Sequence, residues 1–507
     1  MEGNILLTVV SYVILLLTLG TAALIGSYII YVKYGHVKYS HIPGPARTSF
    51  IWGNYTLVAE YIEKDAIRKL TYALYQEFGI IHKLHILHYS FIFILDAKFI
   101  KSLLTNSAHP KPAADYKHLS SLYGQRAAGK GLLAETSHSR WEKKRALINT
   151  AFQRQVLKDL VSGFNQSADN FINHLIPLAD GQQEVRMMDQ FSIVTLDVIA
   201  RVGFGMDIDV INESNCPFPR AVSLILKGIM SSVMKPWLRL DPSRKSRKFR
   251  REVREAVCLI RDTGSDVIIM RKAAKERGEE LPLDILTHIL IACDYRAVDD
   301  FGMEEMIDEF ITLFIAGHET TSNLLAFTIQ QLSRFPSVYE KVQVELEEVI
   351  GDKKNVSYDD VMSLEYLSLV LKETLRMYPP VQGTSRTLGF DVTFGQYHLP
   401  RGSHIVASHL AMCMMDRYFD DPEVFRPERF QQLGDTSRPK HIGAYFPFSL
   451  GQRSCIGQHF ALIAARVILA KLLRSLRFQL VPGQTFTVRN DVTIKPRDGC
   501  VMFIEQL

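Results

Sequence analysis

The chain has 507 residues, of which 47% are hydrophobic and 22% are charged, and its formal net charge at pH 7 is +5. These proportions are typical of a globular protein, and so small a net charge over this length does not favour a nucleic-acid-binding protein. The cysteines stand singly, at Cys216, Cys258, Cys293, Cys413, Cys455 and Cys500. Their spacing favours neither a zinc site nor a disulfide framework, so we expect free thiols in a reducing compartment.

The first predicted element is a membrane anchor, because residues 3–32 contain no charged side chain. A helix of this length exceeds the hydrocarbon core of a bilayer, which is about 30 Å thick. Lys33 and Lys38 follow the apolar run, and a basic flank of this kind stays on the cytoplasmic side. The alternative is a signal peptide cleaved near Ala22 or Ala23. The long apolar run and the absence of a basic residue before it disfavour that alternative.

A proline-containing spacer, residues 33–50, follows the anchor of residues 1–32. Pro43 and Pro45 fix their own φ angles and disfavour helix in the residues before them. Residues 51–507 show no second linker or internal repeat, and we expect them to form one domain. Apolar residues recur with helical spacing at 141–178, 303–335, 337–350, 360–377 and 456–475, and strand-like alternation is confined to 81–95 and 392–408. The predicted fold is therefore mainly α with a minor β portion.

The stretch from Phe448 to Gly457, FSLGQRSCIG, surrounds Cys455 with residues that a haem thiolate ligand requires. Gly451 and Gly457 lack a Cβ atom, so the backbone can approach a flat macrocycle closely. A helix predicted to begin just after Cys455 points its positive end at the sulfur and lowers the thiol pKa. Arg453 offers a forked donor for a propionate, and Phe448 can cover the sulfur. The alternative is an inert buried cysteine.

This segment resembles the haem-binding signature F-x-x-G-x-R-x-C-x-G of the cytochrome P450 superfamily. The resemblance implies the cytochrome P450 fold with an N-terminal transmembrane anchor helix. It also implies haem b (iron protoporphyrin IX) as the cofactor, with Cys455 as the axial ligand of the haem iron. Three further segments fit the family in the expected order, so the resemblance covers essentially the whole predicted domain.

The segment AGHETT, Ala316 to Thr321, lies within the helical run 303–335. The small side chain of Ala316 lets a helix lie against the haem face. In the family, an acid–alcohol pair such as Glu319 and Thr320 delivers protons for oxygen activation, and we expect these two residues to be catalytic. The alternative is a solvated glutamate beside a threonine packed within its helix.

The segment KETLR contains Glu373 and Arg376, which meet on one helix face because they are three residues apart. The resemblance adds Arg429 of the segment PERF, completing a buried network that holds the cysteine loop. The alternative is an exposed ion pair, which contributes a few tenths of a kcal/mol.

Trp141 and Arg145 are four residues apart on one predicted helix. In the family both reach one haem propionate, and Arg386 matches the donor to the other propionate. The alternative for each arginine is an ordinary surface cation. Arg140, Lys143 and Lys144 of the same helix predict a cationic docking face, although such charges also serve solubility alone. No flavin or nicotinamide module is evident, so a membrane-bound NADPH–cytochrome P450 reductase is the implied electron donor.

The stretches FIAGHET, LVLKETLRMYPP and YFPFSLGQRSCIGQ, and the HIPGP spacer, are similar to a subgroup of the superfamily that hydroxylates the cholesterol side chain at carbon 24. The resemblance implies a sterol substrate and a single-pass protein of the endoplasmic reticulum membrane with a cytoplasmic catalytic domain. Expected apolar pocket walls are Ile311, Phe314, Ala316 and Val381. The alternatives are oxidation of fatty acids or xenobiotics, a haem-thiolate isomerase that needs no reductase, and a non-catalytic membrane protein that binds haem or sterol.

Overall fold

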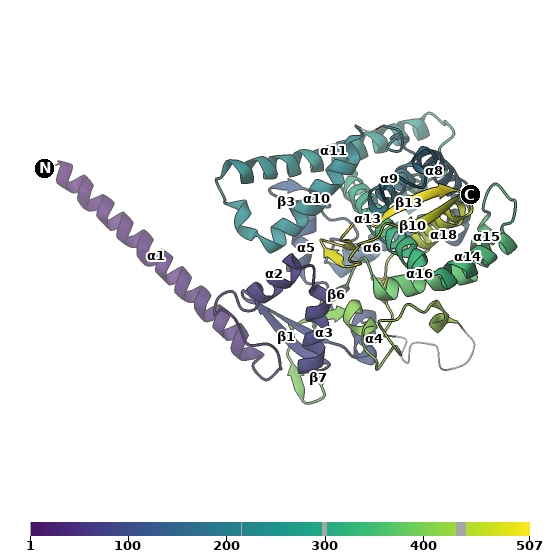
Figure 1. Cartoon of the computed structure of the whole chain (residues 1–507). Helices are drawn as coiled ribbons and strands as arrows, with labels where there is room; N and C mark the ends of the chain where they lie inside the picture. The colour runs from purple at the N-terminus through teal and green to yellow at the C-terminus, as the bar shows by residue number, and fades with distance from the viewer. Residues whose placement is uncertain (1, 214, 297–301, 432–442) are drawn as a thin grey trace. The chain divides into compact units, whose positions relative to one another are not determined.

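The computed structural model describes residues 2–213, 215–296, 302–431 and 443–507 (Figure 1). The chain forms two compact units. The first comprises residues 1–95 and 387–407, and the second comprises residues 96–386 and 408–507. Helices dominate the second unit and short sheets accompany them, which confirms the predicted fold class.

The first unit begins with α1 (Glu2–Lys38), which continues six residues beyond the predicted anchor. An 18-residue window within residues 7–38 of α1 has a mean hydropathy of 2.2, and within the described residues this is the one helix long and apolar enough to cross a membrane. Near its end, Val32 and His36 are buried. Because α1 ends at Lys38, the basic residues Lys33 and Lys38 lie on its last turns and not in the spacer.

The first unit continues with α2 (Tyr55–Glu63), α3 (Ile67–Phe78), β1 (Ile81–Ile86), β2 (Tyr89–Ile94), β7 (Val392–Phe394), β8 (Tyr397–Leu399) and β9 (His404–Ser408). Strands β1 and β2 form an antiparallel hairpin in which Leu84 faces Phe91. Strand β9 pairs with β2 in parallel, with Ile405 beside Ile92. The predicted strand regions are therefore confirmed, and the chain returns to this sheet after a long excursion.

The second unit contains the remaining helices: α4 (Ala97–Thr105), α5 (Ala113–Ser120), α6 (His138–Ile148), α7 (Arg154–Asp159), α8 (Val161–Leu175), α9 (Met187–Val198), α10 (Pro217–Met234), α11 (Arg244–Glu276), α12 (Ile285–Arg296), α13 (Met303–Arg334), α14 (Pro336–Val349), α15 (Tyr358–Ser363), α16 (Glu365–Met377), α17 (His409–Cys413) and α18 (Gln458–Ser475). Its strands include β3 (Ser121–Leu122), β4 (Gln125–Arg126), β5 (Val185–Arg186), β10 (Leu476–Leu480), β11 (Val488–Asn490), β12 (Ile494–Pro496) and β13 (Val501–Gln506).

Three of the five predicted helical regions match single helices closely. The region 360–377 comprises two helices, α15 and α16, with a break at Leu364, and the region 141–178 is also interrupted. Helix α6 gives way to a short 3-10 turn, Asn149–Phe152, after which Gln153 adopts an extended conformation. The helical pattern resumes in α7 and α8 because each piece keeps its own apolar face. The sequence prediction missed α2 to α5, α9 to α12 and α17. It also missed the C-terminal strands, which are only three to six residues long.

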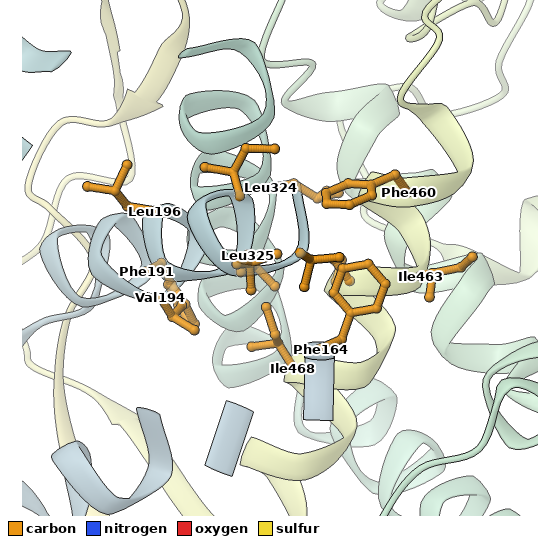
Figure 2. Packing of buried hydrophobic residues seen from close by; sticks show 14 of the residues in the cluster. Phe164, Phe191, Val194, Leu196, Leu324, Leu325, Phe460, Ile463 and Ile468 are labelled. Carbon is orange, nitrogen blue, oxygen red and sulfur yellow. The ribbon is translucent and has the colours of Figure 1, made fainter. Parts of the chain in front are cut away.

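The core of the second unit lies where α8, α9, α13 and α18 meet (Figure 2). The rings of Phe164 on α8 and Phe460 on α18 are 5.1 Å apart in an edge-to-face arrangement. Leu324 and Leu325 of α13 are fully buried in the same cluster, together with Phe191 of α9. Burying each such side chain contributes about 1.5–3 kcal/mol.

Helix α13 crosses this core with side chains buried around its whole circumference, as a helix surrounded by others must be. Its burial is interrupted once within the core. Residues 306–314 and 318–319 are buried, whereas Ala316 is exposed and Ile315 and Gly317 are half-buried. The AGHETT segment lies at this short open face, and the packing of α13 fixes the position of the segment.

Candidate active site

The loop that carries Cys455 is a compact turn immediately before α18. The Ser454 amide donates to the Gly451 carbonyl at 3.0 Å, and the Cys455 amide donates to the Phe448 carbonyl at 2.8 Å. Gly451 has a φ of +73°, and a Cβ atom there would lie 2.5 Å from the Leu104 carbonyl oxygen. Only glycine fits at that position.

Gly457 differs from Gly451. It caps α18 with a φ of −85°, and a Cβ atom would lie 4.0 Å from the Cys455 sulfur, which is an ordinary contact distance. The polypeptide alone therefore does not require glycine at residue 457. If glycine is required there, the reason is a bound group that occupies the space beside the sulfur.

The thiol of Cys455 combines exposure with desolvation. Its side chain is accessible, yet the surrounding protein desolvates it and raises its pKa. The Gly457 amide and the Arg145 charge both act to lower the pKa, but burial outweighs them. The expectation that the helix start alone lowers the thiol pKa is therefore wrong for the polypeptide, because desolvation is the larger effect.

Three basic side chains gather in the second unit, from Lys111, Arg386 and Arg453. The Arg453 guanidinium lies 4.1 Å from the ring centre of Trp141 and donates to the Glu135 carbonyl at 2.7 Å. Burial, followed by the charge of Arg386, lowers the pKa of Arg453 to about 10.

Arg386 is 2% exposed and donates to the Ser385 carbonyl at 2.8 Å. Burial lowers the pKa of Lys111 well below its ordinary value, and the charges of Arg453 and Arg386 lower it further. The Lys111 ammonium donates to the Leu133 carbonyl at 2.9 Å and lies 4.3 Å from the ring centre of Tyr116. We call Lys111, Arg386 and Arg453 the cation cluster.

The cation cluster is not neutralised by the polypeptide. Within the described residues, no carboxylate lies within ion-pair distance of any of its three members. The Glu135 carboxylate, whose charge reaches Arg453, is paired with Arg140 at 2.9 Å. Buried cations that repel one another are costly unless an anion binds them. The cluster is thus built to receive negatively charged groups.

Arg145 occupies a different place from the other predicted propionate donors. Its guanidinium donates to the Ser454 carbonyl at 2.7 Å and to the Asn149 side chain at 2.8 Å. It therefore lies against the cysteine loop, where its charge acts on Cys455. Trp141, four residues earlier, is buried under Arg453.

Glu319 is buried and accepts hydrogen bonds from strand β12 and from the residue that precedes this strand. Its Oε1 accepts from the Lys495 ammonium at 2.6 Å and from the Thr493 hydroxyl at 2.9 Å. Burial alone would raise the pKa of Glu319, but the Lys495 charge and these hydrogen bonds lower it overall. The Thr320 hydroxyl donates to the Ala316 carbonyl of the same helix at 2.9 Å. The acid is thus held as a carboxylate on the β12 side, and the alcohol lies at the open face.

Glu373, Arg376 and Arg429 form the predicted buried network. Arg376 donates to both carboxylate oxygens of Glu373, at 2.8 and 2.9 Å, and Arg429 donates to one of them at 3.0 Å. Glu373 is 0% exposed. The arginines also bind the carbonyls of Cys413 and Val424. The prediction of a buried network is confirmed, and the alternative of an exposed ion pair is wrong.

Two neighbours connect this network with the segment leading to the cysteine loop. The Tyr445 hydroxyl donates to the Lys372 carbonyl at 3.0 Å, and the Phe446 amide donates to Nδ1 of His409 at 3.1 Å. Residues 445 and 446 are therefore fixed against α16 and α17, immediately before the loop begins. The helices α16 and α17, which the network contacts, thus also contact the segment before the cysteine loop, and the prediction that the network holds this loop stays a prediction.

The predicted docking face needs correction, because Lys144 is buried. Its ammonium donates to the Lys130 carbonyl at 2.8 Å and lies 3.4 Å from the Glu305 carboxylate. Arg140 is paired with Glu135, and Lys143 is exposed. Helical spacing alone could not separate the inward-facing lysine from the outward-facing one.

Two of the four predicted pocket walls are core residues. Ile311 and Phe314 are fully buried, and the Phe314 ring lies 5.5 Å from that of Phe310 in a stacked pair. Ala316 and Val381 are exposed. Apolar side chains on the same helix are indistinguishable in the sequence, so only the packing shows which of them are accessible.

The sequence prediction missed Lys111, Tyr116 and Lys495. Lys111 stands between two prolines in HPKP, and Lys495 lies in a short strand, so neither has a distinctive motif. The only available signal was a basic residue in an otherwise apolar or proline-containing stretch, which is too common to identify a site.

Comparison with known proteins decides the family. A model of the cytochrome P450 family matches residues 43–499. The chain belongs to the cytochrome P450 family. It is 28% identical over 468 residues to cytochrome P450 4d2 of Drosophila melanogaster, covering 87% of this chain and 89% of that protein. It is also 28% identical to cytochrome P450 3A5 of Homo sapiens, covering 69% of this chain and 70% of that protein.

Membership implies haem as the cofactor, and the residues of this cytochrome P450 fit that group. A haem carries an iron that a cysteine sulfur can ligate and two propionates that need basic partners. The side chain of Cys455 is accessible, and the cation cluster lacks carboxylate partners among the described residues. The donor set therefore matches both the metal and the anionic edge of the cofactor.

Proposed function

We propose that this cytochrome P450 is a membrane-bound monooxygenase that hydroxylates a sterol, at carbon 24 of the cholesterol side chain. Dioxygen is the oxidant, and electrons come from NADPH through NADPH–cytochrome P450 reductase. The observation that carries the monooxygenase assignment is the combination of the Cys455 loop, the cation cluster and the Glu319–Thr320 pair in one family fold. The similarity of FIAGHET, LVLKETLRMYPP and YFPFSLGQRSCIGQ to cholesterol 24-hydroxylases supports the sterol.

In this proposal Cys455 ligates the haem iron as a thiolate, with Phe448 covering the sulfur and Gly451 permitting the turn. When bound, haem supplies activation of dioxygen, so that one oxygen atom enters a C–H bond and the other leaves as water. The charge of Arg145 beside the sulfur favours the thiolate over the thiol.

Arg386, Arg453 and Lys111 bind the propionates, and Trp141 supports the Arg453 guanidinium from below. The propionates complete a cluster that the polypeptide leaves positively charged. Each charge-assisted hydrogen bond of this kind contributes about 1.5–3 kcal/mol. The cation cluster would thus contact the propionates of the cofactor, and Cys455 would contact its iron.

Proton delivery follows from the positions of Glu319 and Thr320. Thr320 presents its hydroxyl beside Ala316, where the helix face is open. Glu319 is held by Lys495, whose side chain is 15% exposed and so reaches solvent. We infer that protons enter on the β12 side, pass to Glu319, and reach the reacting oxygen through the Thr320 hydroxyl.

The anchor places this chemistry at a membrane. Helix α1 is long and apolar enough to cross a bilayer, and Lys33 and Lys38 flank its apolar stretch. We propose a single-pass protein of the endoplasmic reticulum with its catalytic domain in the cytoplasm. Such a location presents lipid-soluble substrates and the membrane-bound reductase together.

A substrate screen tests the assignment. The purified full-length protein is incubated with reductase and NADPH, together with sterols, fatty acids or xenobiotics, and products are identified by mass spectrometry. A product of cholesterol carrying one added oxygen at carbon 24 supports the proposal. Oxidation of fatty acids or xenobiotics alone would overturn the sterol assignment. Turnover without NADPH would indicate an isomerase. Sterol binding without turnover would indicate a non-catalytic protein.

The ferrous carbonyl spectrum is the companion measurement. A thiolate ligand from Cys455 shifts the Soret band far to the red of its position with a neutral ligand. Absence of that shift in intact, haem-loaded protein would contradict the role of Cys455, whatever the substrate.

A further inference from the structure

A second positively charged site lies in the second unit, apart from the cation cluster. It is a hollow of about 350 Å³ between α5, the β3–β4 turn, the 3-10 turn Pro236–Arg239 and α11. The lining residues are Lys117, Ser121, Tyr123, Gly124, Arg239, Arg250 and Arg254. We call this the basic hollow. It shares no residue with the proposed haem site.

Four of the seven lining residues are basic and none is acidic. Among the residues that the structure describes, Lys117, Arg239, Arg250 and Arg254 have no carboxylate within ion-pair distance. The Arg250 guanidinium donates to the Asp241 carbonyl at 2.8 Å and to the Leu238 carbonyl, which fixes its position. Four cations around one concave surface attract an anion strongly.

The acidic residue close to Arg250 is already satisfied. One carboxylate oxygen of Asp241 accepts from the Ser243 hydroxyl at 3.0 Å, and the same oxygen accepts from Ser246 at 2.5 Å. Asp241 is not among the lining residues. Its charge therefore belongs to the start of α11 and does not occupy the basic hollow.

Tyr123 gives independent evidence for a ligand. It is 9% exposed, and its hydroxyl has no hydrogen-bond partner in the part of the chain that the structure describes. A buried unsatisfied hydroxyl costs about 1–3 kcal/mol unless something binds it. Burial raises the pKa of Tyr123, while the charges of Arg239 and Arg250 lower it, so the hydroxyl faces the cations.

The backbone holds Tyr123 in an unusual conformation. Its φ is +50°, and that of Gly124 is +90°, in the two-residue turn between β3 and β4. A bulky residue with positive φ is uncommon and persists only where its surroundings enforce it. Both positive φ angles belong to the two-residue hairpin turn, and this turn places Tyr123 in the lining of the basic hollow.

We propose that the basic hollow binds the phosphoryl group of an anionic lipid headgroup. Arginine forks and a lysine ammonium are suited to phosphate oxygens, and the Tyr123 hydroxyl supplies a neutral donor. A soluble phosphate has the same chemistry, but the neighbouring surface favours a lipid. Trp237 is 47% exposed and Leu240 is 88% exposed, on either side of Arg239. Exposed apolar side chains beside a basic pocket fit a lipid with its chain alongside.

Calorimetric titration tests this proposal on the full-length, haem-loaded protein in neutral detergent. The probes are inorganic phosphate, dihexanoyl phosphatidic acid and dihexanoyl phosphatidylcholine. We expect phosphatidic acid to bind most tightly, phosphate to bind weakly, and phosphatidylcholine not to bind. Equal affinity for phosphate and phosphatidic acid would overturn the lipid assignment while supporting a phosphoryl site. Failure of both anions to bind would overturn the proposal.

Variants locate the binding. Lys117→Gln and Arg239→Gln should each weaken phosphatidic acid binding about fivefold. Tyr123→Phe should also weaken it, without changing the net charge. The matched controls are Lys245→Gln and Arg247→Gln, which remove exposed charges of α11 that do not line the basic hollow. If the controls lose as much affinity as Lys117→Gln, diffuse charge explains binding and the proposed site is wrong. Because no turnover is measured, the result is independent of the proposed enzymatic function.

Discussion

Two regions of the second unit both bury arginines, and they differ in what neutralises them. Arg376 and Arg429 share the Glu373 carboxylate, so that network is satisfied within the chain. The partners of the cation cluster of Lys111, Arg386 and Arg453 are backbone carbonyls, a threonine hydroxyl and two aromatic rings. The first arrangement stabilises the fold, and the second awaits a ligand. Variants of the two regions should therefore differ in which property they change.

The largest effect is expected from Glu373→Ala. Removing this carboxylate leaves two buried guanidinium groups unpaired, so the free energy of unfolding should fall by about 3–5 kcal/mol. Chemical denaturation, followed by circular dichroism, measures the loss. Glu365→Ala is the matched control, since Glu365 is an exposed acid on the same helix. Equal losses in both variants would show that the network contributes no special stability.

Arg386→Met should separate cofactor retention from folding. Apoprotein stability should stay constant or rise, because a buried cation without a carboxylate is removed. Haem should dissociate about tenfold to a hundredfold more readily, as a charge-assisted bond is lost. Transfer of haem to apomyoglobin gives the rate.

Arg466→Met is the control for Arg386→Met. Arg466 is also buried and has no carboxylate within ion-pair distance among the described residues. It donates to the Val361 carbonyl at 2.8 Å and to the Leu462 carbonyl at 3.1 Å. We expect this variant to retain haem normally. Faster haem loss from Arg466→Met than from Arg386→Met would break the comparison between the two regions.

Thr320→Ala tests the open face of α13. The variant should keep its haem and its carbonyl spectrum but release several times more hydrogen peroxide per NADPH consumed, because a proton donor is missing. Thr328→Ala is the control, since the Thr328 hydroxyl makes the same bond within the helix, at 2.7 Å, in the closed core. An unchanged ratio of product to NADPH in Thr320→Ala would reject the proposed role of Thr320.

A pH-dependent effect concerns His409, which lies beside the satisfied network. Burial lowers its pKa from 6.5 to about 3, and its Nδ1 accepts from the Phe446 amide. The unfolded chain binds a proton here at a higher pH than the folded chain does. Stability should therefore fall as the pH drops from 6.5 toward 3, by up to about 1.4 kcal/mol per pH unit. Denaturation of His409→Gln across this range should show a shallower decline than the original protein shows. Parallel curves would exclude His409 as the titrating group.

The local motifs were predictable because their geometry depends on short separations. Glu373 and Arg376 meet on any helix, and Thr320 can always reach the Ala316 carbonyl four residues earlier. The direction of Glu319 was not predictable. Its partner, Lys495, lies on a strand near the C-terminus, and nothing in the helix specifies that contact.

The sequence by itself determined the family, the cysteine that would ligate iron and the apolar anchor, because each is written in consecutive or regularly spaced residues. Tertiary structure alone decided that Lys111 joins Arg386 and Arg453, that Lys144 faces inward, and that Tyr123 lines a hollow between basic residues. The physical reason is that charge repulsion and burial depend on distances through space. Residues far apart in the chain acquire those distances only when the helices pack.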